Sequence, residues 1–100
     1  MIIYNVTINI DGQVHEEWLD WMKNVHIPEV MSTGYFLENR FSKVLSDDPE
    51  GITYSVQYLC NCMKDYEDYK SNHAPALQKK HTEKFANRFV AFRTLLEVVK

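Results

Sequence analysis

Residues 18–30, WLDWMKNVHIPEV, decide how the first half of the chain folds. Apolar residues in and just before this stretch fall at helical spacing on one stripe, namely Val14, Trp18, Trp21, Met22 and Val25. His26 lies at the edge of the stripe, one turn beyond Met22. Pro28 disfavours helical geometry at Ile27. We therefore predict an amphipathic helix from about Gln13 that ends near Ile27, with a further turn opening at Pro28 as the alternative.

Four segments show the alternation that is typical of strands. Residues 2–10, IIYNVTINI, and 52–60, ITYSVQYLC, alternate cleanly and predict half-buried strands. Residues 35–46 alternate imperfectly, and we expect a bulge to shift their register. A polar turn at 47–51 predicts that this strand forms a hairpin with the next one. The last strand is expected at about 88–99. Asp11, which follows the first strand, is predicted to cap the first helix.

A second helix is predicted to begin near Asn61. Its inner stripe is expected to contain Met63, Tyr66, Tyr69, Lys70, His73 and Leu77. Pro75 predicts a kink or two abutting helices. The resulting order β-α-β-β-α-β predicts an α+β, ferredoxin-like fold, with a four-stranded antiparallel sheet and two helices on one face. We expect residues 1–100 to form a single domain of this type.

Two helices cover only one face of such a sheet. The other face is expected to carry polar residues, namely Asn5, Thr7, Asn9, Ser55, Gln57, Arg93 and Glu97, with Glu38 and Arg40 if the bulge allows. It is also expected to carry Ile3, Leu59, Ala91, Leu95 and Val99. This mixture fits a sheet that faces its twin in a homodimer. A solvent-covered, unpaired face is the alternative.

Composition excludes several classes of protein. The net charge of −3 and the absence of a basic run argue against binding to nucleic acid. The N-terminus lacks the pattern of a signal peptide, and no run approaches the roughly 18 apolar residues of a membrane span. A cytoplasmic protein without a membrane partner is therefore expected. Cys60 and Cys62 lie too far apart along a strand for a relaxed disulfide, so we interpret them as structural thiols.

Histidines are the main candidates for chemistry. His26, at a helix end, can act as a general base, or it can interact with the exposed carbonyl groups of that end. His73 and His81 lack the i, i+4 spacing of a two-histidine metal site, so no metal is predicted and both are interpreted as structural or surface residues. Tyr66 and Tyr69, with Trp18 and Trp21, can line an aromatic pocket or simply form core.

The chain resembles the dimeric α+β barrel superfamily, and within it a small family of uncharacterised bacterial proteins of unknown function. The matching stretches are MIIYNVT at 1–7, W-x-x-W-x-x-x-H-I-P-E-V at 18–30, Y-x-x-Y-x-x-x-H-A-P-A-L at 66–77 and F-V-A-F-R-T-L-L at 89–96. The resemblance implies two ferredoxin-like sheets paired into a homodimer, with a pocket in each subunit.

The superfamily includes cofactor-independent monooxygenases, isomerases and haem-degrading enzymes. In several members a histidine near the end of the first helix faces the pocket, which by resemblance implies a proton-transfer role for His26. The leading prediction is a homodimer that binds a small apolar or aromatic ligand between sheet and helices, without a cofactor. The predicted ligand-binding residues are Trp18, Met22, Tyr66, Tyr69, His73 and Arg93. Haem binding is a further alternative, in which Asn5, Tyr69 and His73 or His81 echo the haem-degrading members, although tyrosine replaces the usual tryptophan.

Overall fold

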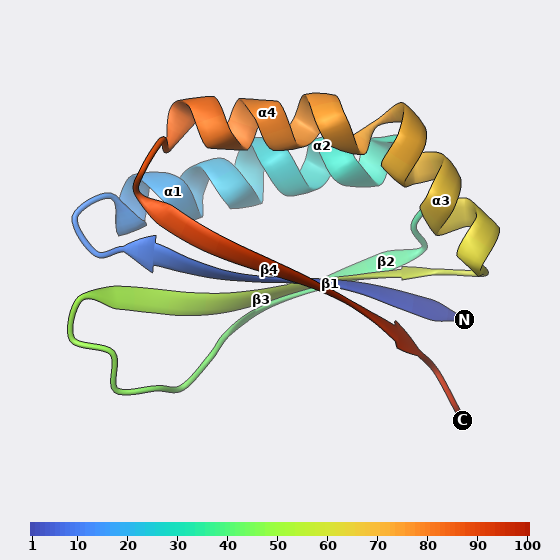
Figure 1. Cartoon of the computed structure of the whole chain (residues 1–100), viewed down its shortest axis with the longest axis horizontal. Helices are drawn as coiled ribbons and strands as arrows, with labels where there is room; N and C mark the ends of the chain where they lie inside the picture. Colours follow the sequence, from blue (N-terminus) through green and yellow to red (C-terminus); the bar gives the residue numbers. More distant parts are fainter.

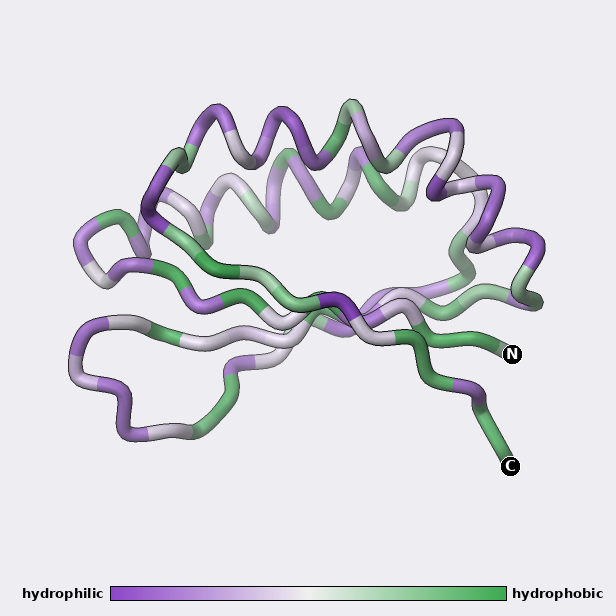
Figure 2. The backbone as a smooth tube through the Cα atoms, viewed as in Figure 1, coloured by the Kyte–Doolittle hydropathy of each residue, from purple (hydrophilic) through white to green (hydrophobic).

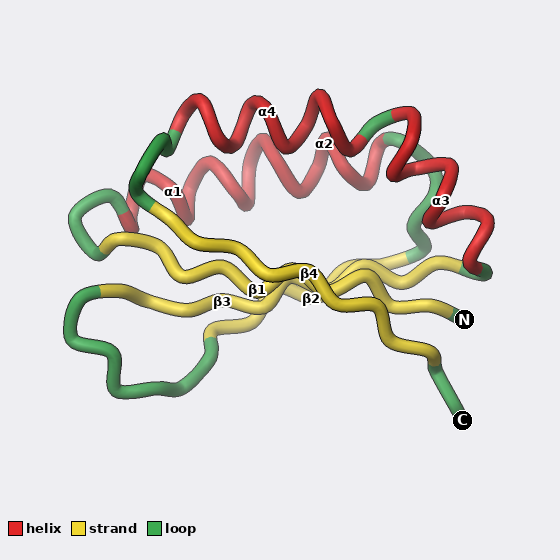
Figure 3. The backbone as a smooth tube through the Cα atoms, in the orientation of Figure 1, coloured by secondary structure: helices red, strands yellow, loops and turns green.

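A four-stranded antiparallel sheet carries a layer of helices on one face (Figures 1 and 3). The computed structural model describes residues 1–100. The elements are β1 (Ile2–Asp11), α1 (His15–Trp21), the π-helical turn η1 (Met22–His26), α2 (Ile27–Ser32), β2 (Glu38–Lys43), β3 (Gly51–Cys60), α3 (Met63–Asn72), α4 (Ala74–Lys84) and β4 (Phe89–Glu97). The strand order β2-β3-β1-β4 confirms the predicted ferredoxin-like α+β fold. No helix is long and apolar enough to cross a membrane.

The core lies between the helices and the central strands. On β1 and β3 the alternating apolar residues face the helices, as predicted, and Ile10, Val56 and Cys60 are almost completely buried. The intervening polar residues lie on the open face, where the Ser55 hydroxyl donates a 2.6 Å hydrogen bond to Asn5 Oδ1. Figure 2 shows that α3 and α4 are largely hydrophilic, while β1 alternates between hydrophobic and hydrophilic residues and β4 begins with a hydrophobic stretch. The sheet therefore contributes much of the apolar surface of the core.

Strand β4 faces the opposite way from the prediction. Its pairing places Arg93 beside Val6 and Ala91 beside Ile8, and directly paired residues share a face. The face toward the helices therefore carries Phe89, Ala91, Arg93, Leu95 and Glu97, and the open face carries Val90, Phe92, Thr94 and Leu96. The prediction was wrong because both alternating sets of β4 are largely apolar, so the pattern alone does not choose between them.

Strand β2 is regular and contains no bulge. Its register runs without interruption from Glu38 opposite Leu59 to Lys43 opposite Tyr54. The strand is shorter than predicted because the chain bends at Leu37, and the buried Phe36 enters the core from the loop before it. Its imperfect alternation reflects its position at the edge of the sheet, where polar residues remain solvated.

The first helix does not end near Ile27. The N–H of Ile27 donates to the carbonyl of Met22, five residues earlier, and helical geometry continues through Pro28 to Ser32. A π turn absorbs one extra residue, so the residues that follow fall back by about 100° relative to an α-helix. As a result Val25, predicted on the inner stripe, is 41% exposed, and Val30 is buried in its place.

Asp11 caps a turn rather than the helix. Its Oδ1 accepts the N–H of Gln13 at 2.8 Å, and its Oδ2 accepts from Arg88 Nε at 2.9 Å. The helix begins only at His15, and the preceding residue gives it no side-chain cap. Asp11 therefore links the end of β1 to the residues just before β4.

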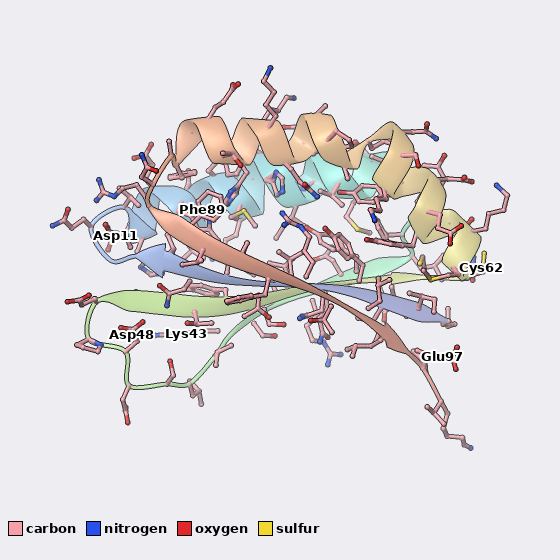
Figure 4. The ribbon with its side chains drawn as sticks, viewed as in Figure 1. Asp11, Lys43, Asp48, Cys62, Phe89 and Glu97 are labelled. Atoms are coloured by element: carbon pink, nitrogen blue, oxygen red, sulfur yellow. The ribbon has the colours of Figure 1, made fainter.

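The second helical region divides into two helices, as Pro75 predicted. His73, with φ −126° and ψ −39°, separates α3 from α4, and Pro75 lies in the first turn of α4. Tyr66, Tyr69 and Leu77 are buried as expected, whereas Met63 and Lys70 are exposed. Cys60 is a buried free thiol, and the thiol of Cys62 is free and exposed just before α3 (Figure 4).

Candidate functional site

A pocket lies between the helix layer and the sheet, beneath α4. Its volume is about 40 Å³, which is room for a few waters. Thr82 on α4 and Arg93 on β4 are exposed lining residues and mark its open side. Figure 4 shows that Phe89 lies at the start of β4, beneath α4. The lining comprises Tyr4, Val6, Ile8, Met22, His26, Val30, Val56, Tyr58, Tyr69, Leu77, Gln78, His81, Thr82, Phe89, Ala91 and Arg93.

His26, the last residue of the π turn, lines this pocket. It lies four residues after Met22, on the same face of the helix. The same turn allows the rings of Trp21 and His26, five residues apart, to stack with centroids 4.9 Å apart and planes 23° apart. In a regular α-helix residues five apart point about 140° away from each other. The stacking fixes the imidazole without using either ring nitrogen.

His26 is neutral and carries an unused nitrogen. Its Nδ1 is enclosed and has no hydrogen-bond partner. Burial lowers the pKa of His26 to about 4, and the charges of Lys80 and Arg93 lower it further, while Glu29 opposes them. Glu29 is itself held by Lys80 Nζ at 2.8 Å. At neutral pH His26 therefore presents an uncharged imidazole to the pocket.

His81 is the second buried histidine of the pocket. Its Nε2 accepts a 2.9 Å hydrogen bond from Trp18 Nε1. Indole nitrogen is only a donor, so Nε2 must be unprotonated and the proton of the neutral ring must be on Nδ1. Burial lowers the pKa of His81 to about 4, with smaller contributions from His26 and Arg93. The two histidine rings lie 5.7 Å apart, and both are uncharged.

Tyrosines and one arginine form the polar remainder of the pocket. Arg93 Nε donates to the hydroxyl of Tyr4 at 3.2 Å. Burial raises the pKa of Tyr4, and the nearby guanidinium of Arg93 offsets only part of this upward shift. Burial also raises the pKa of Tyr58 and of Tyr69, so all three phenols remain protonated donors. No acidic side chain lines the pocket.

The predicted site residues are partly brought together. His26, Met22, Tyr69 and Arg93 line the pocket. Trp18 is completely buried and lies one contact behind it, through its hydrogen bond to His81. Two others lie outside. Tyr66 packs against Tyr4, with ring centroids 5.1 Å apart, and His73 lies at the junction of α3 and α4 beside Tyr35.

Several lining residues were missed from the sequence, chiefly Tyr4, Gln78, His81 and Phe89. A signal for His81 was present, because Ala74, Leu77, His81 and Phe85 recur at helical spacing and all four are buried. A histidine in the middle of such a stripe faces the core. Tyr4 lies among the inward residues of β1, and the local pattern does not distinguish a lining residue there from a core residue.

The residues suggested for haem do not converge. Asn5 lies on the open face of the sheet, where it bonds with Ser55, whereas Tyr69 and His81 line the pocket on the helix side. A pocket of about 40 Å³ is also far smaller than the roughly 300–1,000 Å³ of typical cofactor and ligand sites. The side chains present therefore do not fit a porphyrin. No group of three or more potential metal ligands is present.

Solved structures share this fold at low sequence identity. One is a dimeric ferredoxin-like protein from an uncultured marine organism, with 16% identity, a TM-score of 0.72 and coverage of 100% of this chain and 96% of that one. Another is SnoaB, a cofactor-independent oxygenase from Streptomyces nogalater (8% identity, TM-score 0.70, coverage 99% and 94%). A third is MhuD with two manganese protoporphyrin IX molecules bound per active site (14% identity, TM-score 0.72, coverage of 100% of this chain and 96% of that one). At these identities the similarity shows the fold alone.

No curated protein matches the chain. Residues 1–99 match the family model DUF4286, described as a domain of unknown function. The match covers almost all of the sequence and agrees with the resemblance to uncharacterised proteins. The chain therefore belongs to the DUF4286 family, whose function is unknown.

Proposed function

We propose that the chain is a homodimeric protein that binds a small molecule with an apolar or aromatic body in the pocket beneath α4. The observation that carries this proposal is the enclosed Nδ1 of His26, which has no partner within the chain. Buried polar groups in native proteins nearly always have a hydrogen-bond partner. A ligand with a hydrogen-bonding group would supply the missing partner.

The pocket wall supports an apolar body. Most of its lining is aliphatic or aromatic, including Ile8, Val56 and Phe89. The pocket, at about 40 Å³, takes only a few heavy atoms. A ring-sized ligand would therefore extend through the open side between Thr82 and Arg93. Although this pocket is smaller than most ligand sites, a mostly apolar wall with a few polar groups is typical of them.

The open face of the sheet supports a homodimer. Phe92 is 66% exposed and Val90 is 57% exposed, and Leu96 extends the same row along β4. The flat, mixed face also contains Ile3 and Leu59, beside a shallow hollow. Contiguous exposed apolar surface of this kind marks interaction sites. A second copy packed on this face would bury these side chains, and one of the similar structures is described as dimeric.

Proton transfer is the second candidate function. His26 would accept a proton from the ligand, because its Nδ1 is free and the ring is uncharged at neutral pH. His81 is unsuited to this role, since its Nε2 is occupied by the Trp18 N–H. A base with a pKa near 4 is far from the operating pH and is therefore weak. For that reason ligand binding is the leading proposal.

Replacement of His26 tests both proposals. His26→Phe keeps a ring that can stack on Trp21 but removes the nitrogens. We expect about 10-fold weaker binding of small aromatic probes (phenol, benzamide and benzoate) in NMR titrations, with an unchanged oligomeric state. His26→Ala should likewise abolish any turnover found and leave the dimer intact.

His73→Phe is the matched control, because His73 lies outside the pocket. It should bind the probes as the unaltered protein does. If none of the three probes shifts the amides of pocket residues at millimolar concentration, the ligand-binding proposal is wrong. If the His26 variants lose the dimer instead, His26 serves packing.

A further inference from the structure

Arg93 is an unpaired cation at the open side of the pocket. It is the only lining side chain that is charged at neutral pH, because His26 and His81 are both neutral. It belongs to no salt bridge, although the chain forms five others, and its only side-chain hydrogen bond is the one from Nε to Tyr4. The remaining guanidinium N–H groups have no protein acceptor among the side chains.

The charge of Arg93 acts on the whole pocket. It lowers the pKa of His26 and of His81, and it opposes the upward shift that burial imposes on the pKa of Tyr69. The carboxylate whose charge acts on His26 is that of Glu29, which does not line the pocket and is paired with Lys80. The pocket is therefore electropositive and contains no carboxylate that would neutralise Arg93.

Position strengthens this interpretation. Arg93 lies in the middle of β4, beside Val6, on the face toward the helices. An arginine that served only to be solvated could equally lie at position 92 or 94, on the open face of the same strand. Tyr4 orients the guanidinium at 3.2 Å from Nε. The Tyr4 phenol accepts from Arg93, which leaves its own proton free to donate.

From this geometry we infer that the ligand of the pocket is a monoanion, with a carboxylate or phenolate that pairs with Arg93 and Tyr4. Its apolar body extends inward toward His26. This inference rests on the proposed function and narrows it to one chemical class. A planar carboxylate matches the paired N–H groups of a guanidinium, and charge-assisted hydrogen bonds of this kind are stronger than neutral ones. Cationic ligands would be repelled.

Benzoate and benzamide separate charge from shape, because they share a ring and differ in the anionic group. We expect benzoate to shift the amide signals of Tyr4, Ala91 and Arg93 in ¹H–¹⁵N spectra of the full chain. Benzamide should bind about 10- to 100-fold more weakly. Because the contact is partly exposed, benzoate binding should also weaken as salt is added.

Three variants assign the effect to Arg93. Arg93→Gln should weaken benzoate binding about 10- to 100-fold and leave benzamide binding unchanged. Arg93→Lys should keep part of the affinity, because the charge remains without the paired geometry. Lys79→Gln removes one positive charge from the exposed side of α4 and is the matched control, with benzoate binding unchanged.

The outcomes distinguish the two levels of the proposal. Equal affinity for benzoate and benzamide, or benzoate binding that survives Arg93→Gln, overturns the anion inference and leaves the pocket as a site for neutral ligands. Benzoate shifts confined to surface lysines also overturn it. Absence of pocket shifts with both probes contradicts ligand binding itself.

Discussion

At the scale of single residues, the pocket depends on two histidines that are held uncharged. His26 is kept neutral by burial under Trp21, and His81 by burial together with the N–H of Trp18. Neither is paired with a carboxylate of the pocket. Each therefore takes up a proton less readily in the folded chain than in the unfolded chain. This couples the folding equilibrium to pH.

The free energy of unfolding is expected to fall with acidification between pH 6.5 and pH 4. The folded-state pKa of each histidine is about 4, below the unfolded value of 6.5, so the unfolded chain binds more protons in this window. The stabilisation is therefore present above pH 6.5 and lost as the pH falls toward 4. Each histidine contributes a slope of up to about 1.4 kcal/mol per pH unit. Urea unfolding at several pH values measures it.

His81→Gln isolates one of the two contributions. Glutamine does not titrate, and its carbonyl oxygen can still accept the N–H of Trp18. Between pH 6 and pH 4.5, the free energy of unfolding of the variant should change less steeply with pH than that of the unaltered chain. The difference in slope should be up to about 1.4 kcal/mol per pH unit. Asp11 and Asp48 also have lowered pKa values, so their protonation also lowers the free energy of unfolding, but only at more acidic pH. They therefore do not mask the difference between the two slopes. Equal slopes would show that His81 is not the titrating group.

At the scale of elements, the π turn reconciles Pro28 with a continuous helix. A proline inside an α-helix lacks one N–H and its ring clashes with the carbonyl four residues earlier. The wider turn from Met22 to His26 precedes Pro28 and relieves this conflict. It also keeps the buried residues before and after the turn on one stripe, because the extra residue offsets the phase.

Deletion of Asn24, which is exposed in this turn, tests the relation. The shortened segment can form a regular α-helix with its buried residues still aligned, but Pro28 would then lie in the helix interior. We expect a loss of about 3 kcal/mol in the free energy of unfolding by urea. In a Pro28→Ala background the same deletion should cost much less. An equal cost in both backgrounds would mean that the π turn serves another purpose.

At the scale of the whole molecule, the layered fold leaves one face of the sheet without a partner in the chain. All helices lie on the other side (Figure 1), so the row of Val90, Phe92 and Leu96 on β4 is exposed. Glu97, labelled at the far end of this strand in Figure 4, belongs to the set that faces the helices. The orientation of β4 therefore assigns Arg93 and Phe89 to the pocket and Phe92 to the proposed dimer face.

Phe92→Lys is expected to convert the proposed dimer to a monomer. A lysine in the apolar row of β4 would place an unpaired charge in the proposed interface, which is strongly unfavourable. Analytical ultracentrifugation over a concentration series measures the change. Met63→Lys, at an exposed residue of α3 on the helix side of the sheet (Figure 1), should leave the association unchanged. A monomeric unaltered protein at high concentration would rule out the homodimer.

Much of the fold could be predicted from local patterns. The alternation of β1 and β3, the two helical regions and the break at Pro75 each depend on side chains within a few residues, and the order of these elements favours one topology. The inward position of Met22 and Tyr69 followed in the same way. These features are determined by the sequence itself, because burial of one face of each element is a local requirement.

Tertiary structure alone decided which face of β4 meets the helices, because both of its alternating sets are apolar and only the register with β1 distinguishes them. The same pairing decided the position of Arg93, which was predicted both on the open face and among the ligand-binding residues, in favour of the pocket. It likewise decided that His26 and His81, from separate helices, would lie 5.7 Å apart and share one desolvated site. Contacts between distant segments depend on packing that no local periodicity records, so the chemistry of the pocket emerged only once the chain was folded.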